Sequence, residues 1–223
     1  MEDHSRLIRQ IHESKYKITF VSSGGGTNAI SSLLKVPGAS NTILESYIPY
    51  SKKSMDLFLN RKPDHYCSLD TCLSMAANAY KKSMQIDKES KTKHLIGISV
   101  TASLATTYTK IGNHKFYIAV QTESYTKSIE CILVKGARSR EQEEELITEY
   151  VLCLIAECCG LDKENPQHEE QINIITTKAE KSWKKLLNNE INFVSSDKST
   201  PELIFPGSFN PLHDGHLKMR ELA

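Results

Sequence analysis

The segment KITFVSSGGGTNAISSLLK, residues 17–35, constrains the fold more than any other part of the sequence. An apolar run rich in β-formers ends near three consecutive glycines, and apolar residues then recur at helical spacing from Ala29 to Leu34. This order predicts a strand, a tight glycine-rich turn and a helix. Because the strand enters the helix almost directly, the segment is typical of an α/β domain.

The rest of the sequence continues this alternation. Helices are predicted around Leu7 to Ile11, over SKKSMDLFLN, from about Leu69 to Met84, and over SREQEEELITEYVLCLIAECCG. Strands are predicted over TILESYI, HLIGISVTA, HKFYIAVQT and SIECILVK, the last two as a hairpin. A further helix is expected to end near Asn189, before the linker NFVSSDKSTPE. The order indicates an α/β fold, and the hairpin indicates a mixed sheet.

Composition excludes several classes of protein. The 223 residues allow one sizeable domain with an extension, or two small domains. A formal net charge of +1 provides no strong field for nucleic acid or anionic lipid, so neither partner is expected. No apolar run approaches the roughly 18 to 20 residues that span a bilayer. The charged N-terminus is unlike a secretory signal, and together these features predict a cytoplasmic protein.

The six cysteines show no CxxC pair and no paired metal-ligand spacing. Reduced thiols are therefore favoured over a disulfide framework or a zinc site. We expect no metal site and no resident cofactor.

The glycine-rich turn is the first candidate chemical site. Where a strand enters a helix through glycines, backbone N–H groups point out of the helix N-terminus and an anion can approach them closely. Hydroxyl and amide contacts could come from Ser22, Ser23, Thr27 and Asn28, and Ser22 could be a nucleophile if a base lies nearby. The alternative is a structural turn in which Thr27 or Asn28 caps the helix. The spacing is neither GxGxxG nor that of a P-loop.

The longer run FVSSGGGTNAISSLLKVPGASNTILESYIPYSKKSM resembles the CinA C-terminal domain family, whose best-known activity is deamidation of nicotinamide mononucleotide. The family's AESCTGG, LTxxPGSS and YSNxxK blocks are similar to Ser22–Gly26, Val36–Ser40 and Tyr50–Ser51. CSLDTCLSMAANAY is similar to its VSxxTAxxMA helix, and Thr101 stands where the family has a TGIAGP turn. The resemblance covers about residues 1–160. It implies a three-layer α/β/α fold with a mixed, mostly parallel sheet.

The resemblance also implies a nucleotide site. The serine, tyrosine and threonine that surround the nucleotide in the family correspond to Ser22, Tyr50 and Thr101, which would act in catalysis. The family's lysine falls on Met55, whose thioether cannot accept the serine proton, so Lys52 one helical turn earlier is the candidate replacement. The predicted ligand contacts are Ser23, Gly24, Gly25, Gly26, Thr27, Arg138 and Arg140. For the two arginines, solvation on the surface is the alternative.

Other departures from the family affect the same region. Val21 replaces an acidic residue, Gly24 replaces a threonine, and TASLAT lacks the glycines and proline of the family's turn. Because these changes remove groups that would hold substrate, they favour ligand binding without turnover over an active nicotinamide-nucleotide amidohydrolase. A structural oligomerisation domain is the third alternative, supported by the long apolar-faced helix from Glu141 to Cys159.

A second motif, LIFPGSFNPLHDGHLKM at residues 203–219, combines a short strand, a turn, and two histidines that begin a helix. Backbone amides at such a turn can hold triphosphate oxygens while imidazoles donate to developing charge. The motif resembles the GSF[ND]PxHxGH signature of the nucleotidyltransferase superfamily. The matching residues are Gly207, Ser208, Phe209, Asn210, Pro211, His213, Gly215 and His216. Too few residues follow for the rest of a Rossmann-like domain, so a truncated start of one is expected.

The sequence therefore predicts three parts: a CinA-like domain over 1–160, a helix and linker over 161–200, and a nucleotidyltransferase fragment over 201–223. The favoured function is a nucleotide-binding CinA-like domain, degenerate in catalysis, from a fusion with a nucleotidyltransferase. The expected partners are a mononucleotide or other phosphorylated small molecule and further copies of the chain.

Overall fold

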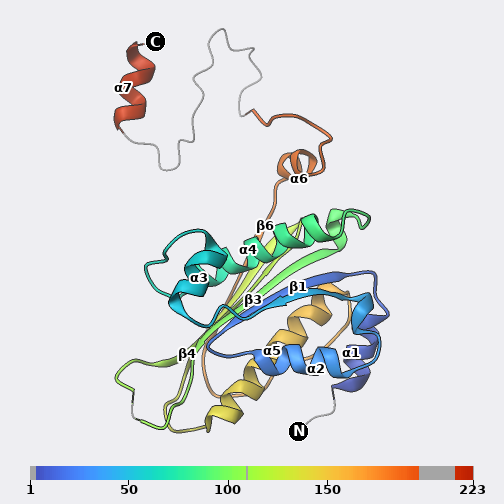
Figure 1. Ribbon diagram of the computed structural model, residues 1–223, viewed down its shortest axis with the longest axis vertical. Helices are drawn as coiled ribbons and strands as arrows, with labels where there is room; N and C mark the ends of the chain where they lie inside the picture. The colour runs from blue at the N-terminus through green and yellow to red at the C-terminus, as the bar shows by residue number, and fades with distance from the viewer. Residues whose placement is uncertain (1–3, 109, 196–213, 223) are drawn as a thin grey trace.

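The structure, a computed structural model, describes residues 4–108, 110–195 and 214–222 (Figure 1). Its helices are α1 (Ser5–His12), α2 (Thr27–Lys35), α3 (Lys52–Leu59), α4 (Leu69–Ile86), α5 (Arg140–Cys158), α6 (Lys181–Leu187) and α7 (Asp214–Leu222), with short 3-10 turns at Ala39–Asn41 and Thr92–His94. Its strands are β1 (Lys17–Ser23), β2 (Ile43–Tyr47), β3 (Leu95–Ser103), β4 (His114–Gln121), β5 (Tyr125–Leu133) and β6 (Ile172–Lys178).

The strands form one six-stranded sheet in the order β2-β1-β3-β4-β5-β6. β1 pairs parallel with β2 and β3, whereas the pairs β3–β4, β4–β5 and β5–β6 are antiparallel. Helices α1, α2 and α5 cover one face, and α3 and α4 cover the other, as Figure 1 shows. The predicted three-layer α/β/α fold with a mixed sheet is confirmed, as is the β4–β5 hairpin.

Two details differ from the expectation. The sheet is not mostly parallel, because parallel pairing is confined to β1 with its two neighbours. The helix expected to end near Asn189 is short, and a strand, β6, precedes it. The sequence INIITTK is rich in β-branched residues, which fit the pleated surface beside β5. The sheet therefore extends beyond residue 160.

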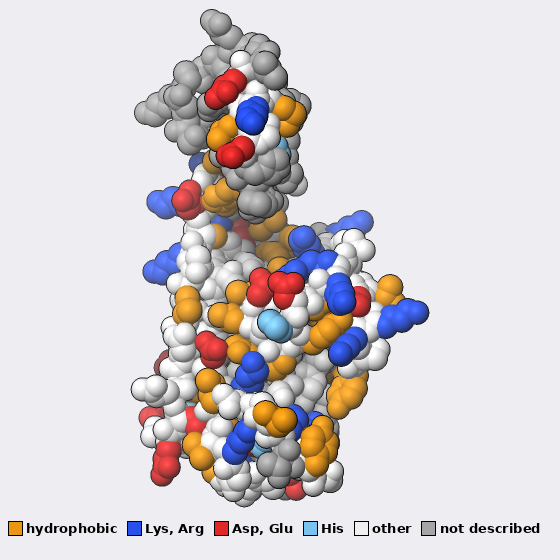
Figure 2. Space-filling model, turned by 90° about the vertical axis from the view of Figure 1, so that its left-hand side faces the viewer, with side chains coloured by type: hydrophobic (Ala, Val, Ile, Leu, Met, Phe, Trp, Pro, Cys, Tyr) orange, Lys and Arg blue, Asp and Glu red, His pale blue; other side chains and the backbone are white. Residues whose placement is uncertain are grey.

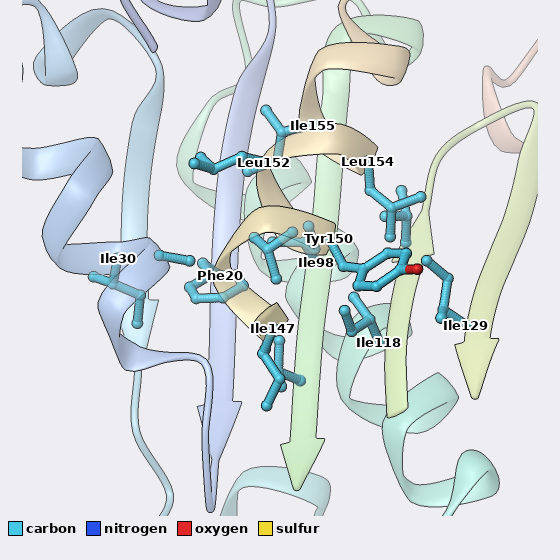
Figure 3. Close-up of a cluster of buried hydrophobic side chains, with 14 of the residues drawn as sticks. Phe20, Ile30, Ile98, Ile118, Ile129, Ile147, Tyr150, Leu152, Leu154 and Ile155 are labelled. Atoms are coloured by element: carbon cyan, nitrogen blue, oxygen red, sulfur yellow. The ribbon is translucent and has the colours of Figure 1, made fainter. Parts of the chain in front are cut away.

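The larger core lies between the sheet and α5 (Figure 3). Alternate residues of the central strands point to this face, because successive strand residues face opposite sides of the sheet. The side chains that meet there include Phe20, Ile98, Ile118 and Ile129 from the strands, Ile30 from α2, and Ile147, Tyr150, Leu154 and Ile155 from α5. This packing fixes the first turn of α5 beside the ends of β1 and β3.

On the other face, α4 packs very closely on β3. A Cβ added at Gly97 would lie 2.3 Å from both the Ala76 carbonyl oxygen and the Tyr80 nitrogen. Only a strand residue without a side chain permits this approach of the α4 backbone to β3.

Ser68 caps α4 as predicted, since its hydroxyl accepts a hydrogen bond of 3.3 Å from the Thr71 N–H.

The second motif falls mostly outside the described residues. Its positions Gly207, Ser208, Phe209, Asn210 and His213 are not described, whereas Gly215 and His216 lie in α7. The predicted helix at this point of the sequence is therefore present. None of the described helices combines the length and hydropathy needed to cross a membrane.

We expect Gly97→Ala to lower the free energy of unfolding by about 1–3 kcal/mol, because the methyl group must push α4 away from β3. Denaturant unfolding monitored by circular dichroism measures the change. Gly112→Ala is the matched control: nothing lies within 4 Å of its added Cβ, so an effect within about 0.5 kcal/mol is expected. Equal stabilities of the two variants would contradict the close packing of α4.

Candidate functional site

The glycine-rich turn joins the carboxyl end of β1 to α2 and is tightly packed. Gly24 and Gly26 have left-handed backbones, with φ of 80° and 87°. A Cβ at Gly24 would lie 2.0 Å from the Ala102 carbonyl oxygen, and one at Gly26 would lie 2.9 Å from a Val100 methyl. The glycines are therefore required by the approach of β3 and by backbone conformation, before any ligand is considered.

The anion-binding end of α2 already holds a carboxylate of the protein. Glu144, from the first turns of α5, accepts hydrogen bonds from the Gly26 N–H at 2.8 Å and from the Asn28 N–H at 3.1 Å. The Thr27 hydroxyl donates to the same carboxylate at 3.1 Å. The turn binds an anion, as the sequence predicts for such a geometry, but the anion is an internal side chain.

The hydroxyls predicted to act in the site are engaged with backbone carbonyls. Ser22 is fully buried and donates to the Gly25 carbonyl, and Ser23 donates to the Pro49 carbonyl at 3.2 Å. Thr101 is buried and donates to the Tyr66 carbonyl at 2.9 Å. Ser22 therefore lacks both the exposure and the neighbouring base that a nucleophile needs.

The two groups predicted for proton transfer lie at the surface. Tyr50 is 71% exposed, and the ammonium of the exposed Lys52 lies 5.7 Å from the centre of the Tyr66 ring. Met55, which stands at the family's lysine position, is buried against Val21 and Met75. No described hydrogen bond or ion pair joins Lys52 to Ser22, so the structure does not assemble the predicted catalytic group.

Part of the predicted ligand site does come together. Tyr50, Gly24, Gly25, Thr27, Asn28 and Arg140 line a pocket of about 370 Å³, together with Glu141 and Glu144. The Arg140 guanidinium donates to the Gly24 carbonyl at 3.3 Å and to the Ala105 carbonyl at 3.0 Å. Arg140 thus links the segments that follow β1 and β3.

Arg138 belongs to a separate network. Its guanidinium donates two hydrogen bonds to the Glu170 carboxylate, and the bond from Nη2 to Oε2 is 3.1 Å long. Nδ1 of His168 lies 3.1 Å from the same Oε2. Tyr150 in turn hydrogen-bonds His168. Burial opposes ionisation of Glu170, but hydrogen bonds from Arg138 and the Val134 N–H outweigh it and hold the pKa of this carboxyl at about 2. The hydrogen bond that Arg138 donates to Glu170 raises the pKa of the Arg138 guanidinium.

Beside Arg140 lies a larger cavity that sequence reasoning missed. Its volume is about 960 Å³, and it lies between the β3–β4 and β5–α5 connections. The described lining residues are Ala105, Thr106, Thr107, Tyr108, Lys110, His114, Lys135, Gly136, Arg138, Ser139 and Arg140. Figure 2 views the side of the molecule that lies at the left in Figure 1, and shows Lys and Arg side chains among hydrophobic ones on that side. No carboxylate is among the described lining residues.

The cations of this cavity are bonded mainly to neutral groups. Lys110 donates to the Leu104 carbonyl at 2.7 Å and to the Ser103 hydroxyl at 3.0 Å. Lys135 donates to the carbonyls of Lys110 and Ile111 at 2.9 and 3.0 Å. Carbonyls satisfy the donors but do not neutralise the charge. Four cations line the cavity: Lys110, Lys135, Arg138 and Arg140. Within the described part of the chain, only Arg138 among them has a carboxylate partner.

A possible metal-binding group lies between α1 and α5. Potential ligand atoms of His4, Glu145 and Glu149 all lie within 4.8 Å of one another. However, the Lys163 ammonium lies 3.2 Å from the His4 Nδ1. A lysine so close supplies positive charge that opposes a metal cation, so this group carries no functional assignment here.

Comparison with known proteins identifies the fold. The sequence matches no protein-family model, and no curated protein matches it. The competence/damage inducible protein CihA from Agrobacterium tumefaciens is similar in structure, with a TM-score of 0.56 at 14% identity over 71% of this chain and 96% of that one. A competence-damaged protein (CinA) superfamily protein from Escherichia coli has a TM-score of 0.54 at 13% identity, over 69% of this chain and 86% of that one.

A superfamily protein from Klebsiella pneumoniae gives a TM-score of 0.56 at 12% identity, over 72% of this chain and 99% of that one. At such identities the likeness concerns the fold alone. The chain thus has a CinA-like fold, in agreement with the resemblance of its glycine-rich segment.

We expect Glu144→Ala to lower the free energy of unfolding by about 1–3 kcal/mol, because two backbone N–H groups at the start of α2 lose their acceptor. Chemical denaturation measures the difference. Glu141→Ala removes an exposed carboxylate from the same helix turn and should change stability by less than about 0.5 kcal/mol. If both variants lose equal stability, Glu144 is not the cap of α2.

A second prediction concerns acid stability. Folding lowers the pKa of Glu170 from its ordinary 4.5 to about 2, so its contribution is present above about pH 4.5 and is lost as pH falls towards 2. We expect Glu170→Gln to cost on the order of 2–3 kcal/mol at neutral pH and progressively less in acid. Urea titrations across this range, with the exposed Glu169→Gln as control, measure it. A cost that is the same at both ends of the range would refute the prediction.

Proposed function

We propose that the CinA-like domain binds a mononucleotide or another phosphorylated small molecule in the basic cavity, without serine-dependent hydrolysis. The observation that carries this proposal is the lining of the cavity. Lys110, Lys135 and Arg140 are bonded to carbonyls or a hydroxyl within the described residues, and no described carboxylate lines the space. A phosphate would supply the missing negative charge.

The position in the fold supports the same proposal. In open α/β sheets, ligands bind outside the carboxyl ends of the strands, where successive helices leave for opposite faces. Here that point lies between β1 and β3, because α2 covers one face and α4 the other. Arg140 and Glu144 occupy part of this crevice. The open volume therefore lies next to it, against the β3–β4 connection.

Size and lining also suit a nucleotide. A volume of about 960 Å³ is at the upper end of ordinary small-molecule sites, which span about 300–1,000 Å³. Tyr108 in the wall is 69% exposed and offers an aromatic face for a base. Thr106, Thr107 and Ser139 supply hydroxyls beside the cations.

The alternative, an active nicotinamide-nucleotide amidohydrolase, lacks a supporting geometry. Ser22 is buried with its proton directed to the Gly25 carbonyl, and Met55 fills the core where the family has lysine. Binding without turnover is consistent with both observations.

Two wider proposals rest on sequence. The motif over residues 203–219 supports a role beside a nucleotidyltransferase in pyridine nucleotide metabolism. Self-association stays a prediction, to be tested by solution mass. The apolar face of α5 no longer supports it, because Ile147, Val151 and Ile155 are buried in the domain's own core.

Calorimetry on the whole chain tests the main proposal. We expect nicotinamide mononucleotide or adenosine monophosphate to bind and the corresponding nucleosides to bind at least about tenfold more weakly, since the phosphate contributes charge-assisted hydrogen bonds. Arg140→Gln and Lys135→Gln should each weaken binding about tenfold. Lys53→Gln, at an exposed position on α3, should leave the affinity unchanged.

Ammonia release from nicotinamide mononucleotide is measured on the same samples. We expect none above background, and no change in Ser22→Ala. Failure of every phosphorylated compound to bind would refute the proposal, whereas Ser22-dependent ammonia release would establish the amidohydrolase instead.

A further inference from the structure

A buried carboxylate holds one histidine in the wall of the basic cavity. Glu143 has no exposed side-chain surface, and its Oε1 lies 2.7 Å from Nδ1 of His114. The other carboxylate oxygen accepts a hydrogen bond of 2.6 Å from the Ala105 N–H. The His114 side chain is 10% exposed and lines the cavity. The pair therefore joins β4, α5 and the β3–β4 connection at the site.

This contact fixes which ring nitrogen can exchange a proton. When Glu143 is ionised, its oxygens only accept hydrogen bonds, and Nδ1 of His114 is then the donor in this contact. A carboxylate that orients an imidazole in this way sets the tautomer and leaves the other nitrogen for a ligand. Nε2 of His114 makes no hydrogen bond to any residue that the structure describes.

The charges around His114 oppose one another. Glu143 on α5 is the hydrogen-bond partner of Nδ1, and four cations line the same cavity. These cations are Lys110 of the β3–β4 connection, Lys135 and Arg138 of the β5–α5 connection, and Arg140 of α5. Glu170 partly offsets Arg138, and the remaining titratable group in the wall is Tyr108. An anionic ligand would neutralise these cations and offer Nε2 an acceptor.

We propose that His114 binds a phosphoryl oxygen of the ligand as an imidazolium through Nε2–H, positioned by Glu143, so that ligand binding takes up a proton. This inference rests on the proposed function of the same cavity and adds the ionisation that the ligand selects. A terminal phosphomonoester carries about two negative charges at neutral pH, whereas a phosphodiester carries one. The cations and the imidazolium together suit the doubly charged group.

The sharpest probe is inorganic sulfate, whose charge does not change over the range in which histidine titrates. We expect the affinity for sulfate to rise about tenfold between about pH 8.5 and pH 5.5, because a charge-assisted hydrogen bond forms only with the imidazolium. His114→Gln keeps a hydrogen-bonding side chain of similar size without a titration, so its affinity should be independent of pH. His65→Gln, at an exposed position before α4, is the control and should behave as the unaltered protein.

A measurement on the unaltered protein keeps the test independent of whether the variant folds. Nuclear magnetic resonance follows the His114 ring through a pH titration with and without saturating sulfate. We expect sulfate to move its midpoint to higher pH, and calorimetry in buffers of different ionisation enthalpy to show proton uptake. An unchanged midpoint would overturn the role of His114.

The outcomes separate this inference from the proposed function. One outcome is that nucleotides bind, the affinity for sulfate is the same at both pH values, and His114→Gln changes neither the nucleotide affinity nor the sulfate affinity. The cavity is then an anion site without a proton-linked histidine. If neither nucleotide nor sulfate binds, the proposed function itself fails. Glu143→Gln adds a check on positioning, since it should reduce the pH dependence while leaving the cations in place.

Discussion

The hydrogen bonds from the glycine-rich turn to Glu144 are the constraint on which the site depends. They join residues more than a hundred positions apart and tie the start of α2 to the first turns of α5. Because a helix N-terminus favours negative charge, this carboxylate takes the place that a ligand's phosphate would occupy. The proposed ligand space consequently lies towards the β3–β4 connection, where the cations lie.

The start of α5 organises both sides of this arrangement. Ser139 and Gln142 form a capping box that fixes where the helix begins. From that point Arg140 reaches the carbonyls beside β1 and β3, whereas Glu143 and Glu144 turn inward to His114 and to the amides of α2. In the sequence, glutamates at the start of a helix indicate only the usual favourable interaction of acidic side chains with the helix dipole. In the structure, two of these glutamates hold specific partners on other elements.

Local pattern predicted most of the fold, because period-two and helical spacing depend on nearby residues. The Ser68 cap and the β4–β5 hairpin are confirmed for this reason. β6 was missed because its Ile and Thr residues follow a polar stretch, and pairing with β5 is what makes them a strand. The role of Glu144 could not be predicted, since nothing in EQEEEL distinguishes the glutamate that meets Gly26 from its neighbours. The replacement of lysine by Met55 was visible, and its burial follows from its hydrophobic character.

The glycines and the cations support function to different degrees. Gly24 and Gly26 are accounted for by positive φ and by contact with Ala102 and Val100, so their presence does not require a ligand. The cations are also held by contacts within the protein, but these contacts do not neutralise their charge. Lys110, Lys135 and Arg140 gather positive charge around one cavity and donate to uncharged carbonyls. Mutual repulsion makes such a cluster unfavourable for folding alone. An anionic ligand is the simplest physical reason for it, and this is why we propose the ligand site in the cavity and not at the glycine-rich turn.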